Sequence, residues 1–243
     1  GISVRDSSIA DISKSEAFES DNDANGSDRL TFLQAIPVSA NNPVAINPVK
    51  TSVVFSNMTL VGPKATAANN GNSLFLAAAQ IRRNSEMSIF NSVFVGWSGG
   101  SVSTLLIDAS KGTPTDKNLA PTGGLNFMGN IIAGPTTNAV SYAASTTAPT
   151  GATTTTITAW VNTTAYGNTI LAANTDAGLA APFAYTAPDF NPTSASAAAA
   201  TGATFTNSKL MTSTSGKADF TTVAYKGACG VGDSWWKVWT SFK

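Results

Sequence analysis

The stretch FSNMTLVGP at residues 55–63 decides the fold, because its pattern returns as IFNSVFVGW at 89–97 and FMGNIIAGP at 127–135. Each copy has an apolar entry, an Asn or Gly at a corner, a short β-type run and a closing glycine. The closing glycines are Gly62, Gly96 and Gly134, which stand 34 and 38 residues apart. The chain is therefore a repeat protein in at least this part.

A repeat of this length, with short strands bent at Asn or Gly, is typical of stacked coils that carry loop insertions. Parallel strands about 4.8 Å apart satisfy their backbone groups only through neighbouring coils, so a series of repeats is required. The pattern predicts an all-β fold, a parallel β-helix (β-solenoid) with loop insertions. The alternative is an antiparallel sandwich, whose short strands also alternate with Gly and Asn turns.

Two further segments test this prediction. LFLAAAQIRR at 74–83 has helical propensity, but it lies just before a repeat strand and just after a Gly-Asn turn, which favours a strand. At the other end, DSWWKVWTSFK at 233–243 concentrates Trp235, Trp236 and Trp239. We expect residues 224–243 to form an aromatic C-terminal cap that closes the core, with sugar stacking on an exposed ring as the alternative.

Composition excludes several function classes. Basic and acidic residues number 14 each, so nothing in the charge attracts nucleic acid. The chain has no histidine and one cysteine, Cys229, which excludes an intrachain disulfide and any His-based site. No stretch is long enough for a transmembrane segment. We expect one domain over 1–243, and strand-like residues directly at the start indicate the C-terminal part of a longer protein.

Several blocks of the chain resemble one group of proteins. The blocks are 15–27 (SEAFESDNDANGS), 53–67 (VVFSNMTLVGPKATA), 81–97 (IRRNSEMSIFNSVFVGW), 105–108 (LLID) and 224–239 (AYKGACGVGDSWWKVW). They are similar to secreted and lipoprotein-type parallel β-helix surface proteins of Bacteroidota-like bacteria. The resemblance implies a right-handed β-helix and an extracytoplasmic location, either secreted or on the outer-membrane surface. It implies no catalytic residues.

The segment SEAFESDNDANGSD contains half of a calcium loop. Asp21, Asp23 and Asn25 alternate as oxygen ligands do, and Gly26 permits the sharp turn. The bidentate Glu of a complete EF-hand is missing, because Phe32 stands there. We expect calcium as the only cofactor, with Glu19 as an additional ligand. The alternative is a solvated acidic turn whose side chains cap local backbone groups.

Four other residues are weaker ligand-binding candidates. Arg82 and Arg83 are able to meet an acidic glycan, although such a pair is more often a surface charge with a salt bridge. Trp97 and Trp160 lie next to repeat strands, and each is able to stack on a sugar ring if its face is exposed.

The sequence favours a non-enzymatic protein. It contains no GxSxG, SxxK, P-loop or dinucleotide motif, and without histidine a nucleophile lacks its commonest activating base. The leading hypothesis is a cell-surface or secreted scaffold, adhesion or glycan-binding module, in contact with a surface glycan or an outer-membrane protein. The alternative is a polysaccharide-acting enzyme, a lyase or glycosidase, or an inactive relative of one, that uses the acidic segment 16–28.

Overall fold

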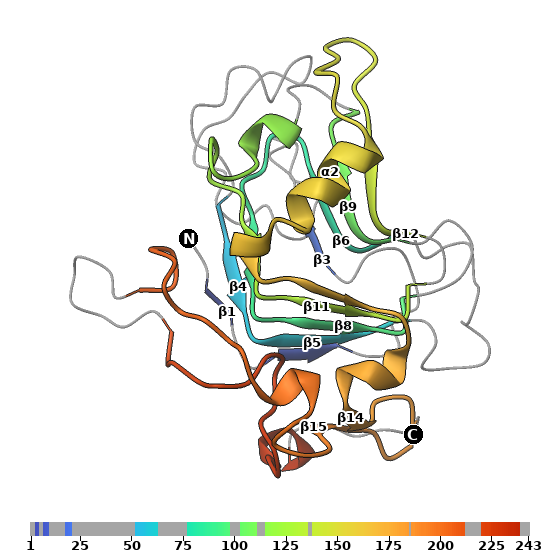
Figure 1. Ribbon diagram of the computed structural model, residues 1–243, viewed down its shortest axis with the longest axis vertical. Helices are drawn as coiled ribbons and strands as arrows, with labels where there is room; N and C mark the ends of the chain where they lie inside the picture. The colour runs from blue at the N-terminus through green and yellow to red at the C-terminus, as the bar shows by residue number, and fades with distance from the viewer. Residues whose placement is uncertain are drawn as a thin grey trace.

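Four β-sheets and one α-helix make up the computed structural model (Figure 1). It describes residues 52–62, 77–97, 103–110, 115–135, 138–184, 186–211 and 220–238, together with the backbone of three short strands that precede them. The strands of successive repeats lie side by side within the sheets, and the segment after them folds back along the sides of the sheets (Figure 1).

Three of the sheets are parallel, and each contains one strand from each successive repeat. The first is formed by β1 (Ser3–Val4), β4 (Val54–Ser56), β7 (Ser88–Phe90) and β10 (Phe127–Met128). The second is formed by β2 (Ser7–Ile9), β5 (Met58–Val61), β8 (Val93–Val95), β11 (Ile131–Ala133) and β13 (Thr169–Leu171). The third is formed by β3 (Phe18–Ser20), β6 (Ala77–Arg82), β9 (Ser103–Asp108) and β12 (Asn138–Ala143).

The register of these sheets matches the sequence repeat. Phe55 pairs with Ile89 and Ile89 with Phe127, so the first residues of the quoted pattern form one column. Leu60, Phe94 and Ile132 form a second column in the next sheet. Each copy thus takes its backbone partners from the copies before and after it, as parallel pairing requires. The strand predicted within 74–83 is also observed, as β6.

The corner between the first and second sheets explains why Asn or Gly recurs there. Asn57, Asn91, Gly129 and Gly167 occupy equivalent places and have φ values of 54°, 48°, 71° and 63°. In this left-handed region a side chain crowds its own backbone, and Gly and Asn tolerate it best. The chain turns sharply at each corner and re-enters the next sheet in register.

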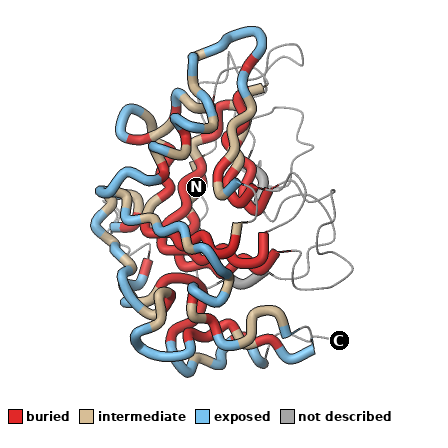
Figure 2. Tube along the Cα trace, turned by 45° about the vertical axis from the view of Figure 1, so that its right-hand side comes forward, coloured by how far each residue is buried: buried red, intermediate tan, exposed pale blue. Residues whose placement is uncertain are grey.

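The main core lies between the three parallel sheets. It is built from buried apolar side chains of all three sheets, among them Phe55, Leu60, Ile81, Phe94, Leu105 and Phe127. The rings of Phe94 and Phe127 contact each other with centroids 5.8 Å apart. Figure 2 shows the buried residues concentrated in the strands, whereas the long connections are exposed.

The predicted fold class, an all-β right-handed parallel β-helix with an aromatic cap, is wrong for the chain as a whole. The fold is of mixed α/β character with four open sheets, and the fourth sheet, β14 (Leu179–Ala181) with β15 (Asp189–Pro192), is antiparallel. Within the described residues, these last two strands join none of the parallel sheets. The departures begin at a helix that the repeat pattern did not predict.

That helix, α2 (Thr154–Val161), packs against β12 and covers the main core (Figure 1). It begins at a reciprocal cap: Thr153 Oγ1 accepts from Thr156 N at 3.2 Å, and Thr156 Oγ1 accepts from Thr153 N at 2.9 Å. Ile157 and Val161, four residues apart, share one face and are buried in the core. A capped helix with one apolar face therefore closes this side of the stack, where a terminal aromatic cap was expected.

The C-terminal segment covers the outer sides of two parallel sheets. Its buried residues Ala177, Phe190, Ala199, Cys229 and Trp236 pack on the outward side chains of β5, β8 and β11. Leu210 and Phe220 pack in the same way on Phe90 of β7. The strands present apolar side chains on both faces, and the second face needs a cover. Trp236 is therefore buried along the flank of the second sheet.

The corner asparagines bind this segment to the sheets. Asn57 Nδ2 donates to the carbonyl of Tyr225 at 2.8 Å. Asn91 makes two bonds to one residue, because its Nδ2 donates to Thr204 O at 2.8 Å and its Oδ1 accepts from Thr204 N at 3.1 Å. The same residues that permit the corner thus hold the returning chain in place.

Candidate functional site

An exposed tryptophan near the C-terminus is the first candidate for a ligand contact on the described surface. Trp235 begins the short 3-10 helix η6 (Trp235–Val238) and is 40% exposed, and Val231, four residues earlier, is 55% exposed. The indole N–H of Trp235 donates to the carbonyl of Ala228 at 3.2 Å, which fixes the ring orientation. We call Val231, Asp233 and Trp235 the terminal aromatic site.

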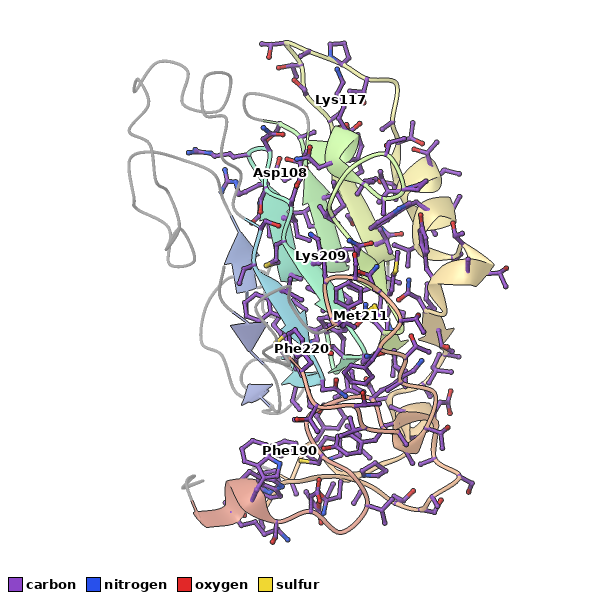
Figure 3. The ribbon with its side chains drawn as sticks, turned by 90° about the vertical axis from the view of Figure 1, so that its left-hand side faces the viewer. Asp108, Lys117, Phe190, Lys209, Met211 and Phe220 are labelled. Atoms are coloured by element: carbon purple, nitrogen blue, oxygen red, sulfur yellow. The ribbon has the colours of Figure 1, made fainter. Side chains whose placement is uncertain are left out.

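The platform beneath this site is well anchored. Trp236, the next residue, is 4% exposed, and its ring meets that of Phe190 edge-on with centroids 5.0 Å apart. Asp233 closes a tight turn by accepting from Gly230 N at 2.7 Å, and its own carbonyl accepts from Asn191 Nδ2 at 2.7 Å. Figure 3 shows Phe190 beside the short terminal helix. The exposed ring is therefore held on a packed base before any ligand arrives.

A second polar site forms where the C-terminal segment crosses β7 and β10. Lys209 Nζ donates to the carbonyl of Gly124 and, at 3.1 Å, to Ser88 Oγ. Asn126 Nδ2 donates to the same two oxygens, at 2.9 Å and 3.5 Å. Figure 3 shows Lys209 lying over the strands of the first sheet. We call Glu86, Ser88, Gly124, Asn126, Asn207 and Lys209 the Lys209 cluster.

Burial shapes the electrostatics of this cluster. It lowers the pKa of Lys209, and the nearby carboxylate of Glu86 acts in the opposite direction. A lysine whose pKa is lowered has a larger neutral, nucleophilic fraction. Ser88 is also hydrogen-bonded to this lysine, but its exposed fraction is 0%. A serine so deeply buried cannot meet an external substrate, so the Ser88–Lys209 pair is not the nucleophile of a hydrolase.

Three of the predicted calcium ligands, Asp21, Asp23 and Asn25, lie outside the described residues. For Glu19 the backbone is described, and it pairs with Gln80 on the neighbouring strand β6. Elsewhere in the described part of the chain, no group of three acidic, His or Cys side chains is arranged to hold a metal ion. Calcium binding by the acidic segment therefore stays a prediction.

The two arginines lie at the end of β6. Arg82 Nε is 3.5 Å from Asp108 Oδ2, which also accepts from Gln80 Nε2 at 2.9 Å. Asp108 thereby joins β6 to β9. A salt bridge was the alternative to glycan binding for the arginine pair, and Arg82 forms one with Asp108. Arg83 follows in a turn with φ 48°.

The two tryptophans proposed as sugar platforms are both engaged with protein. Trp97 is 1% exposed and its indole N–H donates to Leu60 O at 3.2 Å, so the exposure required for sugar stacking is not met. Trp160 of α2 is half-buried; its N–H donates to Ala120 O at 2.8 Å and its ring packs edge-on against Tyr166. The exposed ring is Trp235, which the sequence analysis grouped with the cap.

No helix in the described part of the chain has the length and apolar character needed to cross a membrane. No protein-family model, curated protein or solved structure shows significant similarity to this chain. Function must therefore be argued from the chemistry of the two sites.

Proposed function

We propose that the protein is a non-enzymatic, extracytoplasmic surface or secreted module that binds a glycan at the terminal aromatic site. The observation that carries this proposal is Trp235, whose large aromatic ring is 40% exposed and fixed by a hydrogen bond at 3.2 Å. An exposed aromatic face packs well against the C–H face of a pyranose ring. A ring that is already oriented loses little conformational freedom when it binds.

The surroundings of the ring suit a neutral sugar. Val231, four residues before Trp235, is also exposed, and the carboxylate of Asp233, two residues before Trp235, is able to accept hydrogen bonds from sugar hydroxyls. The chain has a formal net charge of zero, so no general attraction favours a highly charged ligand. A neutral glycan of a cell surface is the ligand class that these features support best.

The test compares Trp235→Ala with Met211→Ala on an array of neutral and acidic glycans. Met211 is a matched control, because it is 54% exposed and belongs to the same C-terminal segment. We expect Trp235→Ala to weaken binding of a retained neutral glycan by about tenfold or more, as loss of a central aromatic contact does. Met211→Ala should bind like the unmodified protein.

Two results would overturn the proposal. One is equal glycan retention by the Trp235→Ala variant and the unmodified protein. The other is a hydrolysed or eliminated product, detected by mass spectrometry after incubation with the retained glycan, because this would indicate a polysaccharide-acting enzyme.

A further inference from the structure

The Lys209 cluster contains an amine, a carboxamide and a carboxylic acid in one partly buried place. Lys209 Nζ and Asn126 Nδ2 both donate to Gly124 O and to Ser88 Oγ. Two donors that share acceptors lie within about two hydrogen-bond lengths, roughly 6 Å, of each other. Glu86 lies beside Gly124, since a Cβ placed on Gly124 would be 2.5 Å from Glu86 Oε2, and its charge acts on Lys209.

More hydrogen-bond donors meet at the carbonyl of Gly124 than this oxygen can accept. The carbonyl of Gly124 is within reach of Lys209 Nζ, Asn126 Nδ2 and Ser88 Oγ, although a carbonyl oxygen has two lone pairs. An ammonium and a primary amide together bring five N–H groups to the cluster. A single secondary amide in their place would bring one, so joining the two side chains would resolve the excess of donors.

The carboxamide of Asn126 is also activated for attack. Its Oδ1 accepts from Asn207 Nδ2 at 3.4 Å, and Asn207 is itself held by Lys209 N, which donates to its Oδ1 at 3.0 Å. A donor on this oxygen stabilises the negative charge that develops when a nucleophile adds to the amide carbon. Nucleophile, electrophile, oxyanion donor and acid thus come together from three distant parts of the chain.

We propose that Lys209 and Asn126 are joined by an intramolecular isopeptide bond, formed by the protein itself with Glu86 as the proton relay. The neutral Lys209 amine adds to Cγ of Asn126, and the tetrahedral oxygen is stabilised by Asn207. Glu86 takes one proton from Nζ and passes it to Nδ2, the Cγ–Nδ2 bond breaks, and ammonia leaves. One C–N bond forms and one breaks, with no change in oxidation state. The product fastens the C-terminal segment covalently to β10.

Burial favours the attack of the Lys209 amine on the Asn126 amide. It lowers the pKa of Lys209, which increases the fraction of the amine that carries a free electron pair. Asn126 is 7% exposed, so water competes poorly for its carbonyl carbon. Apolar side chains close the region from outside, because Leu210 and Phe220 pack over the neighbouring strands. This inference is independent of glycan binding, because Trp235 takes no part in it.

The intact mass of the purified full chain under denaturing conditions tests the bond directly. We expect a mass about 17 Da below that of the sequence, the loss of one ammonia. Lys209→Arg keeps the charge and Asn126→Ala removes the electrophile, and both variants should show the full mass of their own sequences. Glu86→Gln should show a slower or incomplete loss. An unmodified chain with the full sequence mass would overturn the proposal, whatever the variants do.

Digestion locates the bond and excludes another source of ammonia loss. Chymotrypsin cleaves after Leu and aromatic residues, so it should release a branched peptide that joins residues 126–127 to residues 206–210. Trypsin should fail to cleave after Lys209, because an acylated lysine is not its substrate. Asn25–Gly26 and Asn70–Gly71 are able to lose ammonia by cyclising. A mass loss that persists in Lys209→Arg would assign the reaction to those sites and overturn the isopeptide bond.

Discussion

Replacing Asn91 tests how the corners hold the fold together. Asn91 is 1% exposed, lies in the left-handed region with φ 48°, and makes two hydrogen bonds to Thr204 of the returning segment. In the neighbouring repeats the same corner is occupied by Asn57, Gly129 and Gly167. Asn91→Gly therefore removes the two hydrogen bonds and keeps a residue suited to this backbone. Asn91→Ala removes the same bonds and adds backbone strain.

The structure sets the magnitude of both effects. Two side-chain hydrogen bonds contribute about 1 kcal/mol each to the free energy of unfolding. An alanine in the left-handed region costs a further 1–2 kcal/mol, roughly. Glycine avoids this strain but loses about 0.4–1 kcal/mol through the greater freedom of the unfolded chain. We expect a loss of about 3–4 kcal/mol for Asn91→Ala, and about 1 kcal/mol less for Asn91→Gly.

Urea unfolding, followed by circular dichroism and tryptophan fluorescence, measures both variants. The midpoint should fall further for Asn91→Ala than for Asn91→Gly, with the slope against urea unchanged. The order of the two variants is the decisive result, because propensity in regular structure usually favours alanine over glycine. Equal stability, or a more stable alanine variant, would refute the role of the left-handed corner.

Two further predictions concern ionisable groups. Burial lowers the pKa of Lys226 in the folded state below its ordinary value of 10.5. At a pH between the pKa of the folded state and that of the unfolded state, the unfolded chain binds more protons, so stability rises with pH. Lys226→Met should therefore be more stable than the unmodified protein at neutral pH, and this gain in stability should vanish above pH 10.5. A stability difference between the two proteins that stays constant across the whole pH range would contradict this prediction. For the acidic segment, chelation of calcium should lower the unfolding temperature, and the double variant Asp21→Ala, Asp23→Ala should lose this sensitivity. An unchanged melting curve after chelation would remove calcium from the account.

Local sequence predicted the strands and corners because these depend on short-range chemistry. The pattern of apolar entry, Asn or Gly, and β-type run predicted the successive strands β4–β5, β7–β8 and β10–β11, and in the structure these copies pair in the register of the repeat. The spacing of the corners follows from the same residues, since few others accept φ near 50–70°. The helix α2 was missed because TTTITAWV contains β-branched residues of low helical propensity. The helix forms nonetheless, because its cap at Thr153 and the burial of its apolar face stabilise it.

The candidate sites were harder to predict, because each depends on contacts between distant residues. Three tryptophans within five residues signalled an important terminus, but only packing on Phe190 shows that Trp236 is buried and Trp235 exposed. Trp97 was a candidate for sugar stacking, but the core encloses it. Nothing in the sequence near Lys209 indicated a cluster with Asn126, which lies 83 residues earlier.

The sequence by itself determined the repeat and its corners, since a strand of period two and a left-handed corner are encoded within a few residues. It predicted parallel pairing of successive strands but left an antiparallel sandwich open, and the structure shows parallel pairing. Tertiary structure alone decided what covers the sheets and which polar groups meet. A strand that is apolar on both faces requires a partner on each side, and which segment supplies it depends on how the whole chain returns. The Lys209 cluster exists only because residues 203–211 fold back across β7 and β10.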